Sequence, residues 1–87
     1  MIRIVYHSDF LKSAKHLPQK QQKKLSELVE LLERNPFHPL LHTTRLTGEL
    51  IGFLSFRITR DWRVIFQFLD VETVQLLRVK HRKDAYR

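Results

Sequence analysis

The stretch that decides the fold runs from Gly52 to Arg87 and reads GFLSFRITRDWRVIFQFLD (52–70) followed by VETVQLLRVKHRKDAYR (71–87). It holds three runs rich in aromatic and β-branched residues, and short polar breaks separate them. This pattern is typical of consecutive β-strands joined by tight turns. The last run passes into a cluster of Lys, His, Arg and Tyr, so the stretch predicts a sheet that ends in a cationic site.

The first two runs have a clear alternation. One parity is apolar throughout and consists of Leu54, Phe56, Ile58, Trp62, Val64, Phe66 and Phe68. Arg57 and Arg63 have the other parity, and Thr59-Arg60-Asp61 forms the turn between the strands. Because a hairpin keeps neighbouring strands facing the same way, we expect Arg57 and Arg63 to share the surface opposite the core.

The third run is ambiguous, because apolar residues occupy both of its parities. If Leu77 and Val79 face the core, then Arg78 and Lys80 join the two arginines on the open surface, and His81 lies where the strand ends. A plainer alternative is an edge strand whose positive charges prevent edge-to-edge aggregation.

The first half of the chain predicts a strand and two helices. Residues 2–7 alternate as a half-buried strand, and Ser8 or Asp9 can cap a short helix after it. A longer helix is expected from Pro18 to Arg34. Its apolar stripe, at the spacing of one helix face, consists of Leu25, Leu28, Val29 and Leu32.

These elements predict an α+β fold in a single domain that spans residues 1–87. The sheet is small and antiparallel, made of the N-terminal strand plus three C-terminal strands, and a two-helix hairpin packs on one face. Residues 37–49 are expected to form a surface connection. It contains His38 and His42, but Pro39 lies between them and no third ligand is near, so we expect no metal site.

Composition limits the possible partners. Sixteen Lys and Arg against nine Asp and Glu give a formal charge of +7, which favours a polyanionic partner, although such an excess can also serve solubility alone. The chain has no cysteine, which excludes disulfides and thiol nucleophiles. It has no apolar run of about 20 residues and no signal-peptide pattern, so we expect a cytoplasmic protein without a membrane partner.

The chain resembles the RelE/ParE superfamily of type II toxins over nearly its whole length. The motifs that carry the resemblance are Leu46-Thr47-Gly48, Phe56-Arg57-Ile58, Asp61-Trp62-Arg63-Val64-Ile65-Phe66 and His81-Arg82-Lys83-Asp84-Ala85-Tyr86. The resemblance is greatest to the ribosome-dependent mRNA interferases of the RelE, YoeB, YafQ and HigB type. It implies a basic face that cleaves mRNA in the ribosomal decoding site, without metal or organic cofactor.

The resemblance also implies roles for single residues. Arg63 matches the arginine that contacts the scissile phosphate, and Arg57 matches a position that is basic or histidine in several members. His81 matches a near-terminal histidine that transfers protons, and Tyr86 matches an aromatic residue that stacks on a base. The further residues expected to bind RNA are Lys80, Arg82, Lys83, Arg78, Arg45 and His42.

These roles suit RNA cleavage by the 2′-OH, which needs a base for that proton, an acid for the 5′-oxygen and cations at the phosphate. No carboxylate matches the glutamate base of YoeB-like members, so the base stays open among His81, Lys80 and His42. The implied partners are mRNA, the ribosome and a cognate antitoxin, the last in a toxin–antitoxin hetero-oligomer. Two other functions stay open: DNA gyrase inhibition, as in ParE-like toxins, and RNA binding without catalysis.

Overall fold

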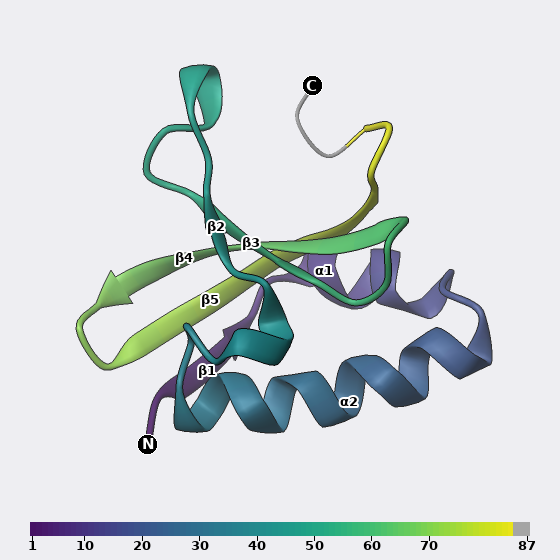
Figure 1. Cartoon of the computed structure of the whole chain (residues 1–87), viewed down its shortest axis with the longest axis horizontal. Helices are drawn as coiled ribbons and strands as arrows, with labels where there is room; N and C mark the ends of the chain where they lie inside the picture. Colours follow the sequence, from purple (N-terminus) through teal and green to yellow (C-terminus); the bar gives the residue numbers. More distant parts are fainter. Residues whose placement is uncertain (85–87) are drawn as a thin grey trace.

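The computed structural model describes residues 1–84, and these form one sheet with two helices (Figure 1). The elements, in chain order, are β1 (Arg3–Tyr6), α1 (Ser8–Lys15), α2 (Gln19–Arg34), the 3-10 turn η1 (Pro39–Leu41), β2 (Thr44–Arg45), the 3-10 turn η2 (Gly48–Leu50), β3 (Leu54–Arg57), β4 (Trp62–Asp70) and β5 (Thr73–His81). Across the sheet the strands follow the order β1-β5-β4-β3-β2. The predicted α+β fold is confirmed.

Two details of the predicted sheet are wrong. β1 pairs with β5 in parallel, with Ile4 beside Val74, whereas an entirely antiparallel sheet was expected. A parallel pair needs a long connection, and the whole chain between β1 and β5 provides it. The predicted surface connection also contributes a strand, since β2 pairs antiparallel with β3 and adds a fifth strand at the edge.

The ambiguity of the last strand is resolved by a β-bulge at Leu77. Phe66 pairs with Leu76, but the preceding residue Ile65 pairs with Arg78, so Leu77 has no partner on β4. The extra residue resets the alternation of β5. Leu76 and Val79 therefore both face the core, at 0% and 6% exposure, although they are three residues apart.

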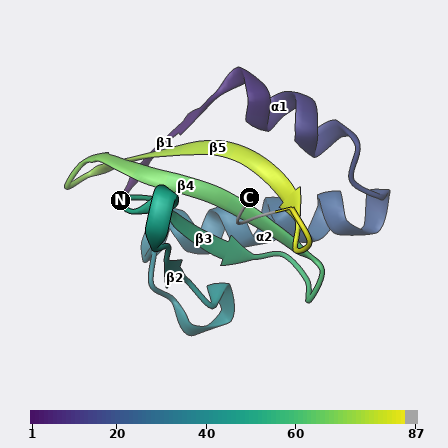
Figure 2. The same cartoon turned by 90° about the horizontal axis from the view of Figure 1, so that it is seen from above.

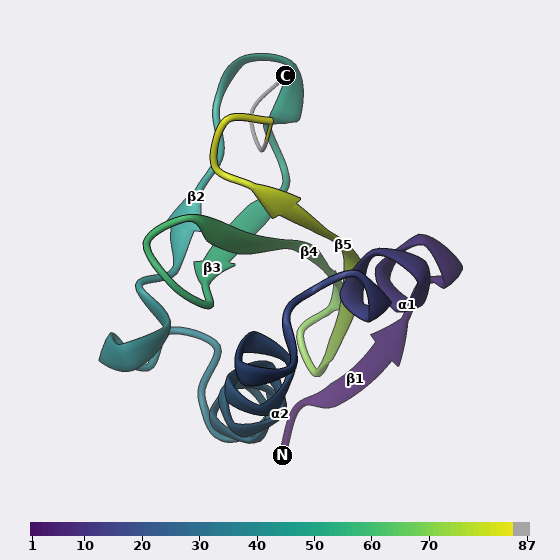
Figure 3. The same cartoon turned by 90° about the vertical axis from the view of Figure 1, so that its right-hand side faces the viewer.

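The helices cover one side of the sheet, with α2 beneath it and α1 beside β5 (Figure 3). The predicted stripe of α2 is confirmed: Leu25, Leu28, Val29 and Leu32 are all buried in the core. The expected cap of α1 is wrong. Its N-cap is His7, whose extended backbone lets Nδ1 accept the Asp9 N–H at 3.0 Å. Among residues 1–84 neither helix combines the length and the apolar character of a bilayer span.

A single hydroxyl attaches α1 to the edge of β5. β1 ends at Tyr6, so the β5 backbone after Leu76 has β4 on one side but no strand on the side of β1. There the Val79 N–H donates to Ser13 Oγ at 2.8 Å, and the same hydroxyl donates to the Asp9 carbonyl at 2.8 Å. Ser13 thereby satisfies a strand donor that would otherwise lie unpaired under a helix.

We predict that Ser13→Ala lowers the free energy of unfolding by about 1–3 kcal/mol, because it leaves the Val79 N–H without an acceptor. Urea denaturation followed by circular dichroism measures the change. Ser26→Ala, at an exposed position of α2, serves as the control and should shift stability by less than about 0.5 kcal/mol. Equal effects of the two variants would contradict the anchoring role of Ser13.

Candidate active site

Three cations from three neighbouring strands lie in one row across the open face of the sheet. Arg57 of β3 pairs in register with Arg63 of β4, and Arg63 pairs with Lys80 of β5. Neighbouring strands are about 4.8 Å apart, so the three backbones lie within about 10 Å of one another. We call Arg57, Arg63 and Lys80 the cationic row. It contains two of the predicted catalytic residues and one predicted RNA-binding residue.

The cationic row has no compensating carboxylate in the part of the chain from residue 1 to 84. The ion pairs formed there join Asp9 to His7 and to Arg78. Arg57 Nε and Arg63 Nε are moreover buried without a hydrogen-bond partner. Like charges directly opposite on paired strands are destabilising, and each unsatisfied buried donor adds to the cost. An anion bound by both guanidinium groups would offset the repulsion between the like charges.

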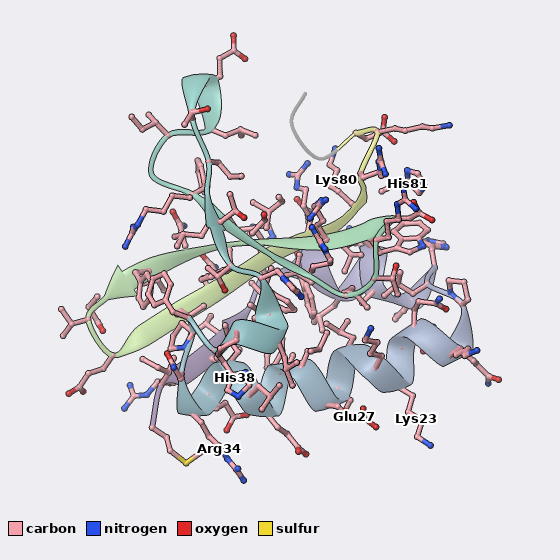
Figure 4. The ribbon with its side chains drawn as sticks, viewed as in Figure 1. Lys23, Glu27, Arg34, His38, Lys80 and His81 are labelled. Carbon is pink, nitrogen blue, oxygen red and sulfur yellow. The ribbon has the colours of Figure 1, made fainter. Side chains whose placement is uncertain are left out.

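His81 lies at the end of β5, directly after Lys80, but its side chain points to the opposite face of the sheet. It pairs in register with Trp62, and the two rings meet edge to face with centroids 5.1 Å apart. Its Nδ1 accepts the Lys83 N–H at 3.3 Å, so the neutral ring carries its proton on Nε2 and can donate from there. Figure 4 shows Lys80 and His81 close together at this end of β5. Strand alternation nevertheless places Lys80, and not His81, on the face of Arg63.

The other predicted RNA-binding residues are dispersed. Arg78 pairs with Ile65 on the open face, next to the cationic row, and contacts Asp9. Arg45 pairs with Leu54 and so has the parity of the core, and its guanidinium lies 5.4 Å from the centroid of Phe37.

His42 is in a left-handed backbone conformation with φ 49°. It lines a pocket of about 360 Å³ between α2 and the end of β3, which Arg57 also lines. Arg82 and Lys83 are exposed in the turn after β5. Tyr86 lies outside the described residues. No group of three potential ligands that could hold a metal ion occurs within residues 1–84.

A groove on the open face brings in residues that the sequence analysis missed. It has a volume of about 410 Å³ and is lined by His7, Asp9, Leu50, Phe53, Ile65, Gln67, Leu77, Arg78 and Lys80. We call it the open-face groove. The only local sign of these two residues in the sequence is the His-x-Asp motif of His7 and Asp9 directly after the first strand. Nothing in the sequence places them beside β5.

A second groove lies between the two helices. It has a volume of about 620 Å³ and a largely apolar lining that includes Tyr6, Phe10, Leu11, Ala14, Leu25 and Val29. Tyr6 and Leu11 remain 46% and 50% exposed in it. Partial burial, together with the nearby Glu33 carboxylate, raises the pKa of the Tyr6 phenol above its ordinary value. We call this surface the helix groove.

Solved structures of similar fold are numerous. YafQ from E. coli is 24% identical, covers 100% of both chains and has a TM-score of 0.78. A YoeB/ParE toxin from Agrobacterium tumefaciens is 18% identical over 93% of this chain and 99% of its own, with a TM-score of 0.79. The RelBE2 toxin–antitoxin complex from Mycobacterium tuberculosis is 26% identical over 93% and 98%, with a TM-score of 0.76.

At the level of sequence, no curated protein matches the chain. A family model does match, and it spans residues 4–86, which include both helices, the cationic row and every strand except the first residue of β1. Its description is the ParE toxin of a type II toxin–antitoxin system, parDE. The chain therefore belongs to the ParE toxin family of the RelE/ParE superfamily and is a type II toxin.

Proposed function

We propose that this toxin is a ribosome-dependent mRNA interferase, an endoribonuclease that cleaves mRNA by attack of the 2′-OH on the adjacent phosphate. The observation that carries the proposal is the cationic row, in which Arg57 and Arg63, each with a buried Nε that has no hydrogen-bond partner, lie beside a third cation. A phosphate in the transition state gains negative charge, and preorganised donors stabilise it most at that point.

The geometry favours a particular division of roles. Arg57 and Arg63 bind the non-bridging oxygens of the scissile phosphate, since guanidinium groups match phosphate in planar, paired hydrogen bonds. Lys80 faces Arg63 and donates from its ammonium to the departing 5′-oxygen. His42, the remaining candidate base, lines a pocket together with Arg57 and accepts the proton of the attacking 2′-OH. His81 holds the end of β5 through Trp62 and the Lys83 N–H rather than transferring the proton. Tyr86 is proposed to stack on a base, as the resemblance implies.

A cognate antitoxin is the proposed protein partner. Several similar structures are complexes with an antitoxin, among them the RelE–RelB complex from Pyrococcus horikoshii and the YoeB–YefM complex from Staphylococcus aureus. The helix groove offers an exposed apolar surface through Tyr6 and Leu11, which suits an amphipathic antitoxin segment that folds on binding. The +7 charge favours an acidic antitoxin as a whole, whereas Glu30 and Glu33 in the lining favour an apolar contact within the helix groove itself.

Gyrase inhibition is the second candidate function, and the description of the matching family favours it. Such a toxin would bind its target without hydrolysing RNA. A DNA supercoiling assay with purified gyrase separates the two functions. We expect no inhibition at toxin concentrations that cleave ribosome-bound mRNA, and inhibition without any mRNA cleavage would establish the second candidate.

We predict that Arg63→Ala lowers the rate of mRNA cleavage by about 10²- to 10³-fold, because it removes donors from the developing phosphorane. Primer extension on a defined mRNA, with and without programmed ribosomes, measures new 5′ ends. Arg34→Ala is the matched control, because Arg34 is exposed on α2, on the far side of the molecule from Lys80 (Figure 4). Absence of cleavage by folded wild-type toxin on programmed ribosomes would refute the proposal, and binding without cleavage would indicate a non-catalytic module.

Lys80→Ala and His81→Ala test which group transfers the proton. We predict that Lys80→Ala reduces single-turnover cleavage at least about 10²-fold, a loss typical of removing a positioned proton donor. His81→Ala should cost less, while lowering the melting temperature through loss of the Trp62 contact. The reverse order of cleavage rates, with His81→Ala more damaging, would return proton transfer to His81.

A further inference from the structure

The open-face groove continues from the cationic row toward the middle of the sheet. Lys80 belongs to both, and Ile65 lies two residues beyond Arg63, at the next position on the same face. In Figure 2 the strands β3, β4 and β5 lie side by side, with α1 along the far side of β5. A strand of RNA whose phosphate lies on the row would therefore have the groove directly beside it. This inference rests on the proposed function and concerns what the groove recognises.

The floor of the groove is apolar. Ile65 is only 6% exposed although it does not belong to the core between helices and sheet. Leu50 and Phe53, from the loop around η2, and the bulged Leu77 complete the apolar lining. An apolar surface of this kind is suited to the face of a nucleobase, because a base stacks on apolar and aromatic groups and hydrogen-bonds only at its edge.

The wall of the groove carries a paired acceptor and donor. Arg78 Nη2 lies 3.5 Å from Asp9 Oδ2, and the two side chains remain 48% and 47% exposed. Each therefore keeps unused hydrogen-bonding capacity: Asp9 a second carboxylate oxygen, and Arg78 further N–H groups. His7 Nδ1 is occupied by the Asp9 N–H, so the neutral ring can only donate, from Nε2.

We propose that the open-face groove is a base-binding pocket for guanine, with Asp9 and Arg78 as the residues that determine specificity. A guanine ring on the floor presents two donors, N1–H and the exocyclic N2 amine, to the carboxylate of Asp9. It presents two acceptors, O6 and N7, to the guanidinium of Arg78.

The other bases fit this pair of residues less well. Adenine offers a single amine donor, and its N1 is an acceptor that would face the carboxylate of Asp9. Cytosine and uracil lack the N7 acceptor that Arg78 would use, and their smaller rings cover less of the apolar floor. The pocket therefore favours guanine over the other bases, because a mismatched base leaves Asp9 or Arg78 without a hydrogen-bond partner.

Nuclear magnetic resonance titration tests the proposal on the intact chain, without ribosomes. The probes are GMP, IMP and AMP, which carry the same phosphate and differ at the base edge. We expect shifts of the amides of Gln67, Leu77 and Arg78, and GMP binding at least about fivefold more tightly than AMP. IMP keeps N1–H but lacks the N2 amine, so its affinity should fall between the two. This series needs only wild-type protein.

Asp9→Asn should bring the ratio of GMP to AMP affinity close to one, because the amide no longer offers two acceptors. Glu72→Gln is the matched control: it makes the same change of charge at an exposed site in the turn between β4 and β5, and should leave the ratio unchanged. Equal affinity of wild type for GMP and AMP, or shifts confined to the cationic row, would overturn the proposal. Guanine selectivity with no ribosomal cleavage would keep the pocket and refute only the proposed nuclease.

Discussion

The bulge at Leu77 is the constraint on which the rest of this structure depends. It allows β5 to bury Val74 and Leu76 in its first half and Val79 in its second, although these residues do not share one parity. A regular strand would direct either Lys80 or Leu76 into the wrong environment. Burying a charged lysine against the core without a partner is costly, so the register that pairs Lys80 with Arg63 is the one that hydrophobic burial and charge solvation both favour.

The same register explains why α1 is placed where it is. β1 is short and accompanies β5 only as far as Leu76. Beyond the bulge, α1 and not a strand lies along this edge of β5. The Ser13 hydroxyl of α1 accepts the Val79 N–H there. This docking brings the start of α1 to the open face, where Asp9 meets Arg78 across 69 residues of sequence. The register of β5 thus determines both the packing of the core and the residues that line the open-face groove.

Much of the fold could be predicted from the sequence because its strongest patterns are local. The stripe of α2 and the alternation in β3 and β4 each follow from one period, and the structure places Arg57 and Arg63 together as that period requires. β5 could not be predicted in the same way, because adjacent apolar residues at Leu76 and Leu77 fit either facing. Only pairing with β4 identifies which residue is unpaired.

The candidate site was predicted less completely, for a related reason. Its residues were taken from short motifs, and neighbours in a motif do not share a face of a strand. Lys80 and His81 are consecutive, yet one faces Arg63 and the other contacts Trp62. His7 and Asp9 reach the open-face groove because β1 pairs in parallel with β5, and no local pattern in the sequence predicts that pairing. The roles of the site residues, Tyr86 included, remain predictions.

The central claim is that the cationic row is the phosphate site of this toxin. It is tested most directly by the salt dependence of binding to an uncleavable 2′-O-methyl RNA. When Arg57, Arg63 and Lys80 are all replaced by glutamine, we expect the slope of log affinity against log salt to become shallower by about 0.7, since the row contacts one phosphate and each phosphate contact on a single strand contributes about that much. Glutamines at Lys20, Lys23 and Arg34, all exposed on α2, should leave the slope nearly unchanged. Equal slopes for the row variant and the wild type would contradict the account.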